Sequence, residues 1–312
     1  MSGEVSALRG APVTSSATKL YARATAGFDE RVAKTVALLQ EAVLEHGTGL
    51  LQSSSLGAED MVITDLIARH KLPISVATLD TGRLHAETLA LLPQIEARYG
   101  LKVNVFSPVN DAVINFVRVR GADAMYESLA LRKECCAIRK LEPLSRMLDG
   151  HTAWITGLRR EQSNNRAIVP FRELDQNGRT KINALADWSW ADVWHYIAAF
   201  DVPFNALHDQ FMPSIGCAPC TRAISVGEDF RSGRWWWEND DAKECGLHKS
   251  HSPAAAGDAQ SAAIGGIVSA QANFGAAEVK DAAAAGHSQD ASAKECGLHA
   301  TRVAELTNGA SA

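Results

Sequence analysis

Short apolar runs alternate with amphipathic, helix-length segments along the first half of the chain. Apolar side chains recur at helical spacing over 29–45, and two glycines separate this segment from a short apolar run at 50–52. The same alternation predicts helices over 59–69 and 84–99 and strands over 74–79, 103–106 and 152–156. Strands separated by helices of this length predict an α/β fold, in which a parallel, twisted sheet carries helices on both faces.

Two loops fall where strands of this sheet would end, and ligands of parallel sheets bind beyond those ends. The first is the serine-rich run 53–57, and the second is the turn 80–82. Small hydroxyl side chains and backbone N–H groups at a helix N-terminus form an anion site. The serine run does not match GxxxxGK[ST] and is closer to the PP-loop of enzymes that handle adenylylated compounds. Serine-rich loops are common, so this loop alone is a weak signal.

The composition limits the classes of protein to which the chain can belong. Of the 312 residues, 46% are apolar and 21% are charged, which is typical of a soluble globular protein. A net charge of −5 and a pI near 6.1 argue against nucleic acid binding, and no apolar run reaches the ~18 residues of a membrane span. The N-terminus lacks the apolar core of a secretory signal. We therefore expect a cytoplasmic protein with a flexible arm at 1–24; a short transit peptide is the alternative.

The composition changes after Lys249. Residues 250–293 are dominated by Ala, Gly, Ser and Gln and have no apolar stripe that a helix could bury. We expect a low-complexity linker there, with a weak alanine-rich helix as the alternative. The predicted domains are the arm 1–24, a core at 25–249, the linker 250–293 and a C-terminal segment at 294–312.

Four of the six cysteines form two close pairs. In a reducing compartment, clustered cysteines bind metals or act in catalysis more often than they form disulfides. Cys217 and Cys220 have the spacing of a zinc-site pair, whereas the adjacent Cys135 and Cys136 would strain the backbone if both bound one ion. In an iron–sulfur cube each cysteine can bind a different iron. We therefore favour an iron–sulfur cluster over zinc or four unrelated buried thiols.

Basic residues follow several of these features. Lys140 lies four residues after Cys136, on a predicted helix over 133–148 that starts at the cysteine pair. The arginines that stand out by position are Arg159, Arg166, Arg231 and Arg234. Guanidinium groups suit bidentate recognition of phosphate and sulfate oxygens. Taken singly, each of these cations has a surface salt bridge or a solvated charge as its alternative.

Together these motifs resemble the iron–sulfur adenylylsulfate reductases within the phosphoadenylylsulfate reductase family. The matching segments are SSSLGAED, LDTGRLHAET, KECCAIRKLEP, TGLRREQSNNRA, IGCAPCTRAI, GRWWWE and KECGLH, in family order. The resemblance covers about residues 25–249, and the cysteine pairs with ECGLH make it specific. It implies an adenine nucleotide alpha hydrolase-like (PP-loop) fold with a mobile C-terminal tail.

The resemblance also implies a reaction. Adenylylsulfate would be reduced to sulfite and AMP in sulfate assimilation and cysteine biosynthesis, with an external thioredoxin or glutaredoxin-like protein as the electron donor. A tail cysteine would form an S-sulfo intermediate, and one [4Fe-4S] cluster on Cys135, Cys136, Cys217 and Cys220 would act with Lys140 in an electrostatic and structural role. Neither nucleic acid nor a membrane is implied, and a homo-oligomer is left open.

Substrate-binding positions are carried over motif by motif. They are Ser54, Ser55, Leu79, Gly82, Lys140, Arg159, Arg166, Arg231 and Arg234. The alternatives are a phosphoadenylylsulfate reductase that keeps a cluster, an ATP-using PP-loop thiolation enzyme and a non-catalytic iron–sulfur sensor.

Two copies of the hexapeptide Lys-Glu-Cys-Gly-Leu-His contain the remaining cysteines, Cys245 and Cys296. We expect Cys245 to be the nucleophile, because it follows the tryptophan run at the spacing usual in the family. Family members usually end soon after this motif, so the second copy is a departure. Cys296 is either an alternative nucleophile on a long tether or a duplication without function.

Overall fold

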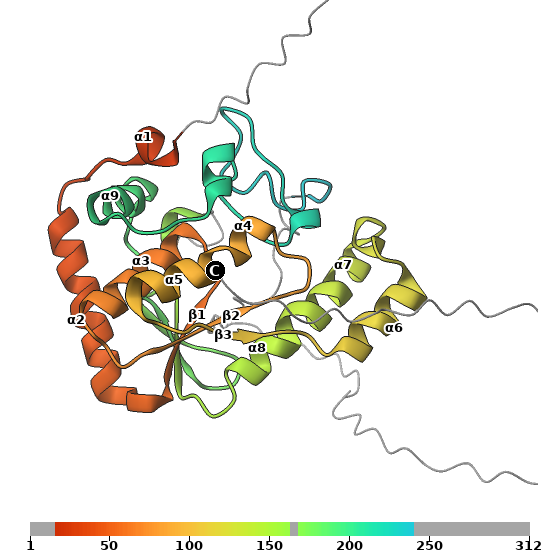
Figure 1. The fold of residues 1–312 in the computed structure, drawn as a ribbon, viewed down its shortest axis with the longest axis horizontal. Helices are drawn as coiled ribbons and strands as arrows, with labels where there is room; N and C mark the ends of the chain where they lie inside the picture. Colours follow the sequence, from red (N-terminus) through yellow and green to blue (C-terminus); the bar gives the residue numbers. More distant parts are fainter. Residues whose placement is uncertain (1–15, 163–167, 240–312) are drawn as a thin grey trace, which may run out of the picture. The chain divides into compact units, whose positions relative to one another are not determined.

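The computed structural model describes residues 16–162 and 168–239 (Figure 1). The described residues form a six-stranded sheet in the order β3-β2-β1-β4-β6-β5. Its strands are β1 Leu50–Ser54, β2 Ser75–Leu79, β3 Asn104–Phe106, β4 Ala153–Thr156, β5 Arg172–Leu174 and β6 Thr180–Asn183. All neighbouring strands pair in parallel except the edge strand β5, which is antiparallel to β6. The predicted parallel α/β sheet is confirmed.

Helices cover both faces of this sheet. Alternate side chains of a strand point to opposite faces, and Leu50 and Val76 join one core with helices α2, α3, α5 and α9. Leu51 and Ala77 face a second core, to which α8 contributes. Figure 1 shows α3 and α5 on one side of the strands and α8 on the other. The helices are α1 Ala17–Tyr21, α2 Phe28–His46, α3 Ala58–Arg69, α4 Ala86–Leu89, α5 Leu91–Tyr99, α6 Asn110–Arg120, α7 Leu129–Cys136, α8 Glu142–Met147 and α9 Trp190–Phe200.

The predicted helices and strands agree with the structure, with two differences. The expected helix over 84–99 is divided into α4 and α5 at Ala90. Pro93 has no backbone N–H with which to continue the hydrogen bonding of α4, so the chain starts a new helix in which proline lies in the first turn. The second difference concerns the cysteine pair and is described with the site below.

The strand order places a ligand site at the centre of the sheet. From β1 the chain builds β2 and β3 on one side, and it then crosses to place β4 on the other side of β1. Such a switch point leaves a crevice beyond the carboxyl ends of β1 and β4. The serine run 53–57 was expected to be a loop throughout, but β1 extends to Ser54. The rest of the run follows the strand end and lies at this crevice.

The predicted arm at 1–24 contains a described helix. α1 lies within it; Ala17 is buried, and the Tyr21 ring lies 5.9 Å from that of Trp190. Residues 1–15, the predicted linker 250–293 and the segment 294–312 lie outside the described residues. No helix in the described ranges is both long and apolar enough to cross a membrane.

Candidate active site

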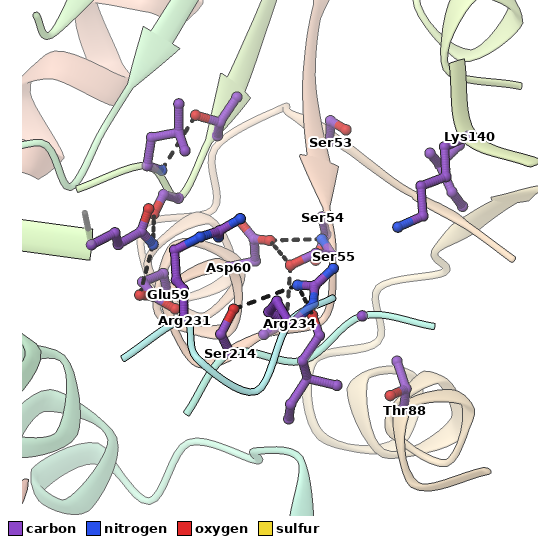
Figure 2. Close-up of a pocket in the computed structure, with 18 of the residues that line it drawn as sticks. Ser53, Ser54, Ser55, Glu59, Asp60, Thr88, Lys140, Ser214, Arg231 and Arg234 are labelled. Carbon is purple, nitrogen blue, oxygen red and sulfur yellow. Dashed lines mark hydrogen bonds between the residues drawn. The ribbon is translucent and has the colours of Figure 1, made fainter. Parts of the chain in front are cut away.

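A cavity of about 210 Å³ lies at the carboxyl ends of β1 and β4 (Figure 2). The serine loop, the N-terminus of α3 and the segment after β4 form its walls together with residues 213–216 and 230–235. Six predicted substrate residues line it, namely Ser54, Ser55, Leu79, Lys140, Arg231 and Arg234. The position at the switch point and this lining make it the candidate substrate site.

The serine loop is held against the N-terminus of α3 by Asp60. The backbone N–H and the hydroxyl of Ser55 both donate to Asp60 Oδ2, each at 2.6 Å. The Ser54 hydroxyl accepts from the Leu56 N–H at 3.1 Å, and Leu56 has a left-handed backbone with φ of 59°. Burial raises the pKa of Asp60 to about 6 although the hydrogen bonds from Ser55 lower it. Asp60 therefore fixes the shape of the loop, and its charge is sensitive to pH.

Gly157, which follows β4, allows the strand end to approach α3. A Cβ at this position would lie 2.7 Å from Asp60 Oδ1 and 2.8 Å from Glu59 Cβ, closer than side-chain carbons normally approach. Glycine therefore keeps β4 and the start of α3 together beneath the cavity.

Three cations from two separate segments reach the cavity. Lys140 belongs to the helical segment after the cysteine pair, whereas Arg231 and Arg234 precede Trp235. Arg234 is buried and donates to the carbonyl of Ile215 at 3.2 Å. Figure 2 shows the Lys140 amine directed towards the part of the cavity where the serine loop lies. Cations opposite a loop of hydroxyls and N–H groups suit a ligand with several anionic oxygens.

Arg159 is not among the residues that line the cavity. Its side chain is 1% exposed, and it donates to Glu59 Oε1 and Glu161 Oε2, both at 2.9 Å. Glu59 lines the cavity; burial raises its pKa, but the Arg159 charge and a hydrogen bond from Gln162 outweigh burial and hold the pKa below its usual value. The structure thus places Arg159 behind the cavity wall, where it supports Glu59.

Two more predicted substrate residues are not placed at the cavity. Gly82 has a φ of 68° and donates its N–H to Asp80 Oδ1 at 2.9 Å, and it is not among the lining residues. Arg166 lies outside the described residues, as do Cys245 and Cys296.

The four clustered cysteines line a second, smaller cavity. Cys135 and Cys136 come from α7, whereas Cys217 precedes the short 3₁₀ turn Ala218–Cys220 and Cys220 ends it. All four are buried and none forms a disulfide. Arg83, Arg132, Arg139 and Lys140 line the same cavity. The structure therefore brings together two cysteine pairs that are about 80 residues apart in the chain.

The helix that carries the first pair differs from the prediction. The pair was expected to start a helix over 133–148, but it ends α7, which starts at Leu129 because the Ser128 side chain caps it by accepting from the Leu131 N–H. A π-helix at Ala137–Leu141 follows, and α8 continues from it. The wider π turn changes the spacing on which the position of Lys140 was estimated, and such turns are frequent at functional sites.

The chemistry of this second cavity suits a cluster with several metal ions. Among the residues that the structure describes, no three His, Cys, Asp or Glu side chains are arranged to hold a single metal ion. Four buried thiols around one space, with four cationic side chains, match an anionic cluster in which each thiolate binds a different iron. The Lys140 charge lowers the pKa of the Cys217 thiol even though burial raises it. The residues present therefore fit an iron–sulfur cluster better than zinc.

The two cavities meet at Lys140 and at the loop after β2. Lys140 lines both of them. Thr81 lines the larger cavity, and its hydroxyl lies 3.2 Å from the Cys217 sulfur. The Ala218 N–H donates to the carbonyl of Arg83 at 2.7 Å. The two cavities therefore share one cationic side chain and are bridged by the loop after β2.

Several cavity residues were not predicted. Asp60 and Glu59 had a signal, because carboxylates in the first turn of a helix interact favourably with its dipole. Thr81 lies in the turn that had been singled out as a ligand loop. His208, which also lines the cavity, lies in a segment with no recognisable motif.

The switch-point cavity, with its serine loop at a helix N-terminus and its facing cations, defines an α/β protein of the adenine nucleotide alpha hydrolase-like class. The model of the phosphoadenosine phosphosulfate reductase domain matches residues 49–223. The chain belongs to the phosphoadenosine phosphosulfate reductase family.

Individual proteins agree with this assignment. The chain is 53% identical over 220 residues to the adenosine 5′-phosphosulfate reductase of Allochromatium vinosum, a match that covers 70% of this chain and 86% of the relative. It is 55% identical over 197 residues to the enzyme of the same name from Burkholderia cepacia, covering 63% and 79%. Among solved structures, phosphoadenylyl-sulfate reductase from Candida auris in a phosphate complex gives a TM-score of 0.52 at 25% identity, covering 63% of this chain and 98% of that one.

Proposed function

We propose that this chain is an adenylylsulfate reductase that acts in sulfate assimilation and releases sulfite and AMP. The observation that carries the proposal is that a phosphate-type cavity and a four-cysteine cavity share Lys140. The relatives above 50% identity are adenosine 5′-phosphosulfate reductases, which favours adenylylsulfate over its 3′-phosphorylated form. The solved structure named for the phosphorylated compound is only 25% identical in sequence to this chain.

The substrate is held by the charge distribution of the larger cavity. Ser54 and Ser55 face the anionic part of the nucleotide, and Arg231, Arg234 and Lys140 line the same cavity. These cations neutralise the phosphate and sulfate oxygens and stabilise the charge that builds up on the phosphate as it leaves. Leu79 contacts the nucleotide, and Gly82 and Arg166 complete the set carried over from the family. Arg159 acts through Glu59.

Cys135, Cys136, Cys217 and Cys220 hold one [4Fe-4S] cluster. When bound, the cluster supplies a fixed charge and a structural centre beside Lys140 rather than the reducing electrons. The contact between Thr81 and Cys217 keeps the loop after β2 in place between the two cavities.

Cys245 carries the chemical step. Its thiolate attacks the sulfur of the sulfate group; an S–S bond forms, the bond from sulfur to the phosphate oxygen breaks, and AMP leaves with the electron pair. A thioredoxin thiolate then attacks the Cys245 sulfur, and sulfite departs. The second thioredoxin thiol resolves the mixed disulfide, so the dithiol loses two electrons and sulfur is reduced from the sulfate to the sulfite level.

The test is anaerobic purification followed by an assay of sulfite release with reduced thioredoxin. Iron-containing protein should release sulfite and AMP in equal amounts from adenylylsulfate, and much faster than from the 3′-phosphorylated compound. Faster release from the phosphorylated compound would change the assigned substrate. A colourless, zinc-containing protein without activity would contradict both the cluster and the reaction. Consumption of ATP in place of adenylylsulfate would favour a thiolation enzyme.

A further inference from the structure

His208 is a buried histidine in the wall of the larger cavity. It lies in the 3₁₀ helix Ala206–Gln210, is 4% exposed and lines the cavity. Neither ring nitrogen forms a well-aligned hydrogen bond with a described residue, although the main chain of Met212 acts on the ring as a hydrogen-bond partner. Buried polar atoms in proteins are almost always hydrogen-bonded. Met212 can serve only one of the two ring nitrogens, so the other indicates a partner that the protein itself does not provide.

The ring is fixed in place, so it cannot find a partner by turning away. It packs edge-on against Trp194 and Trp190, with ring centroids 5.2 and 6.0 Å away. Its helix is capped by Asn205, which donates to Thr88 Oγ1 at 2.8 Å, and Thr88 lines the same cavity. The imidazole is thus held at the cavity wall by packing and by a hydrogen-bonded cap.

The surroundings of His208 favour an uncharged partner. Burial lowers the pKa of His208 to about 4, so the neutral ring offers one N–H donor and one acceptor nitrogen. The charged groups that act on it are the carboxylates of Glu59 and Asp209, not a cation. An anionic phosphosulfate group is attracted instead to Lys140, Arg231 and Arg234. A group that both donates and accepts, such as a ribose hydroxyl or the edge of adenine, suits the neutral ring.

We infer that His208 hydrogen-bonds the uncharged nucleoside part of the bound adenine nucleotide and contributes to its affinity. The inference rests on the proposed function only in that the ligand is an adenine nucleotide. It assigns the end of the cavity lined by His208 to the nucleoside, with Trp190 and Trp194 packed behind the imidazole ring. The cationic residues then hold the phosphosulfate group.

The test measures AMP binding to the iron-loaded protein by calorimetry. His208→Phe keeps a ring of similar size between the two tryptophans and removes both nitrogens. It should weaken AMP binding about five- to tenfold, the value of one net hydrogen bond. His208→Asn and His208→Gln each keep a donor and an acceptor, and at least one should recover most of the affinity. His195→Phe is the matched control, because His195 contacts Phe28 outside the cavity, and it should bind AMP as the wild type does.

Analogues identify the contacted group. 2′-Deoxy-AMP, 3′-deoxy-AMP and inosine monophosphate should each bind the wild type more weakly than AMP if they lack a contacted group. An analogue that binds the wild type and His208→Phe equally well lacks the group that His208 contacts. If His208→Phe binds AMP as tightly as the wild type, the inference is wrong. It is also wrong if His208→Phe loses the same affinity for AMP and for inorganic pyrophosphate and neither His208→Asn nor His208→Gln recovers it. A wild type that binds AMP but releases no sulfite would refute the proposed reaction alone; one that binds no adenine nucleotide would refute both.

Discussion

Asp60 links the shape of the serine loop to pH. Its ionised carboxylate accepts two hydrogen bonds from Ser55, and charge-assisted bonds are about twice as strong as neutral ones. Because burial raises its pKa to about 6, the carboxyl takes up a proton as the pH falls from 7.5 to 5. AMP affinity of the wild type should therefore fall through this range. In Asp60→Asn it should be about tenfold weaker at pH 7.5 and should change less with pH. Calorimetric titrations at several pH values measure both effects.

Stability should change in the opposite direction to affinity. The folded-state pKa of Asp60 lies above that of the unfolded chain, so its protonation adds stability that is fully present below the unfolded pKa and is lost as pH rises through about 6. The free energy of unfolding of the wild type, relative to Asp60→Asn, should therefore increase as pH falls from 7.5 to 5. Asp65→Asn is the control, since Asp65 is a buried carboxylate on the same helix that binds Tyr99 and Tyr196 outside the cavity. An identical pH profile of AMP affinity in wild type and Asp60→Asn would refute this role.

For individual residues, sequence motifs could identify candidates but could not predict where each side chain points. Ser54 and Ser55 were predictable because their loop chemistry is local. Arg159 looked like a phosphate ligand, yet its guanidinium points to Glu59, which lies 100 residues earlier in the chain. Thr81 and Cys217 are separated by 136 residues, and no local pattern reports their contact. Long-range packing decides what each side chain faces.

The segment 231–238 is fixed to the cysteine-bearing helix α7 by one buried side chain. Arg132 is fully buried and binds both oxygens of Glu238, at 2.9 and 2.7 Å. The Trp235 ring lies 4.6 Å from the Arg132 guanidinium and 4.6 Å from that of Arg234. Trp235 has a φ of 42°, a conformation that a bulky side chain keeps only when its surroundings enforce it. Arg132 and Glu238 thus hold the wall that carries Arg234.

Breaking the Arg132–Glu238 ion pair should destabilise the segment 231–238 and its attachment to α7. Glu238→Gln removes the carboxylate charge from a buried ion pair, and such changes cost about 3–5 kcal/mol. The free energy of unfolding in urea, measured anaerobically on iron-loaded protein, should fall by that order, and iron should be lost sooner because Arg132 also interacts with Cys136. Glu228→Gln is the matched control, since the Arg222–Glu228 pair is one-third exposed and should change stability by less than about 1 kcal/mol. Equal effects of the two substitutions would contradict the role of Glu238.

Elements with a strong local pattern were predictable, and elements defined by pairing were not. The apolar runs of β1 and β2 and the amphipathic α2 stand out in the sequence because burial on one or both faces shapes their composition. β5 is a three-residue edge strand, and its polar sequence carries no period. α9 begins with a capping box of Ser189 and Asp192, a signal that sequence reasoning could have used. The position of β4 beside β1 depends on a crossover that no single strand encodes.

On the scale of the molecule, the shared position of Lys140 joins the cluster site to the substrate site. The loop after β2 and the segment 231–238 each contact both regions, through Thr81 and through Trp235. A chain that lost its cluster would therefore lose support on two walls of the substrate cavity. Under the proposed function, this arrangement would let the cluster support the substrate cavity without transferring electrons.

Two thiols, Cys245 and Cys296, are candidates for the nucleophile of the proposed reaction. Glu238 is bound to Arg132 in the wall of the four-cysteine cavity. Cys245 follows seven residues later, so it lies at most about 25 Å of extended chain from Glu238. Cys296 follows the predicted linker, and the effective concentration of a tethered group falls as its tether lengthens. We therefore expect Cys245→Ser to abolish sulfite release from adenylylsulfate and Cys296→Ser to leave it nearly unchanged.

The intermediate distinguishes the two thiols directly. With adenylylsulfate and no thioredoxin, intact-protein mass spectrometry should find one added sulfo group in the wild type and in Cys296→Ser, and none in Cys245→Ser. Peptide mapping should place this group on Cys245, because a shorter tether to the described site gives the higher effective concentration. Truncation after Lys249 should retain the activity and serves as the control for the second copy. Equal losses in the two serine variants, or a sulfo group on Cys296 in the wild type, would mean that the distant copy reaches the same cavity and that tether length does not select the nucleophile.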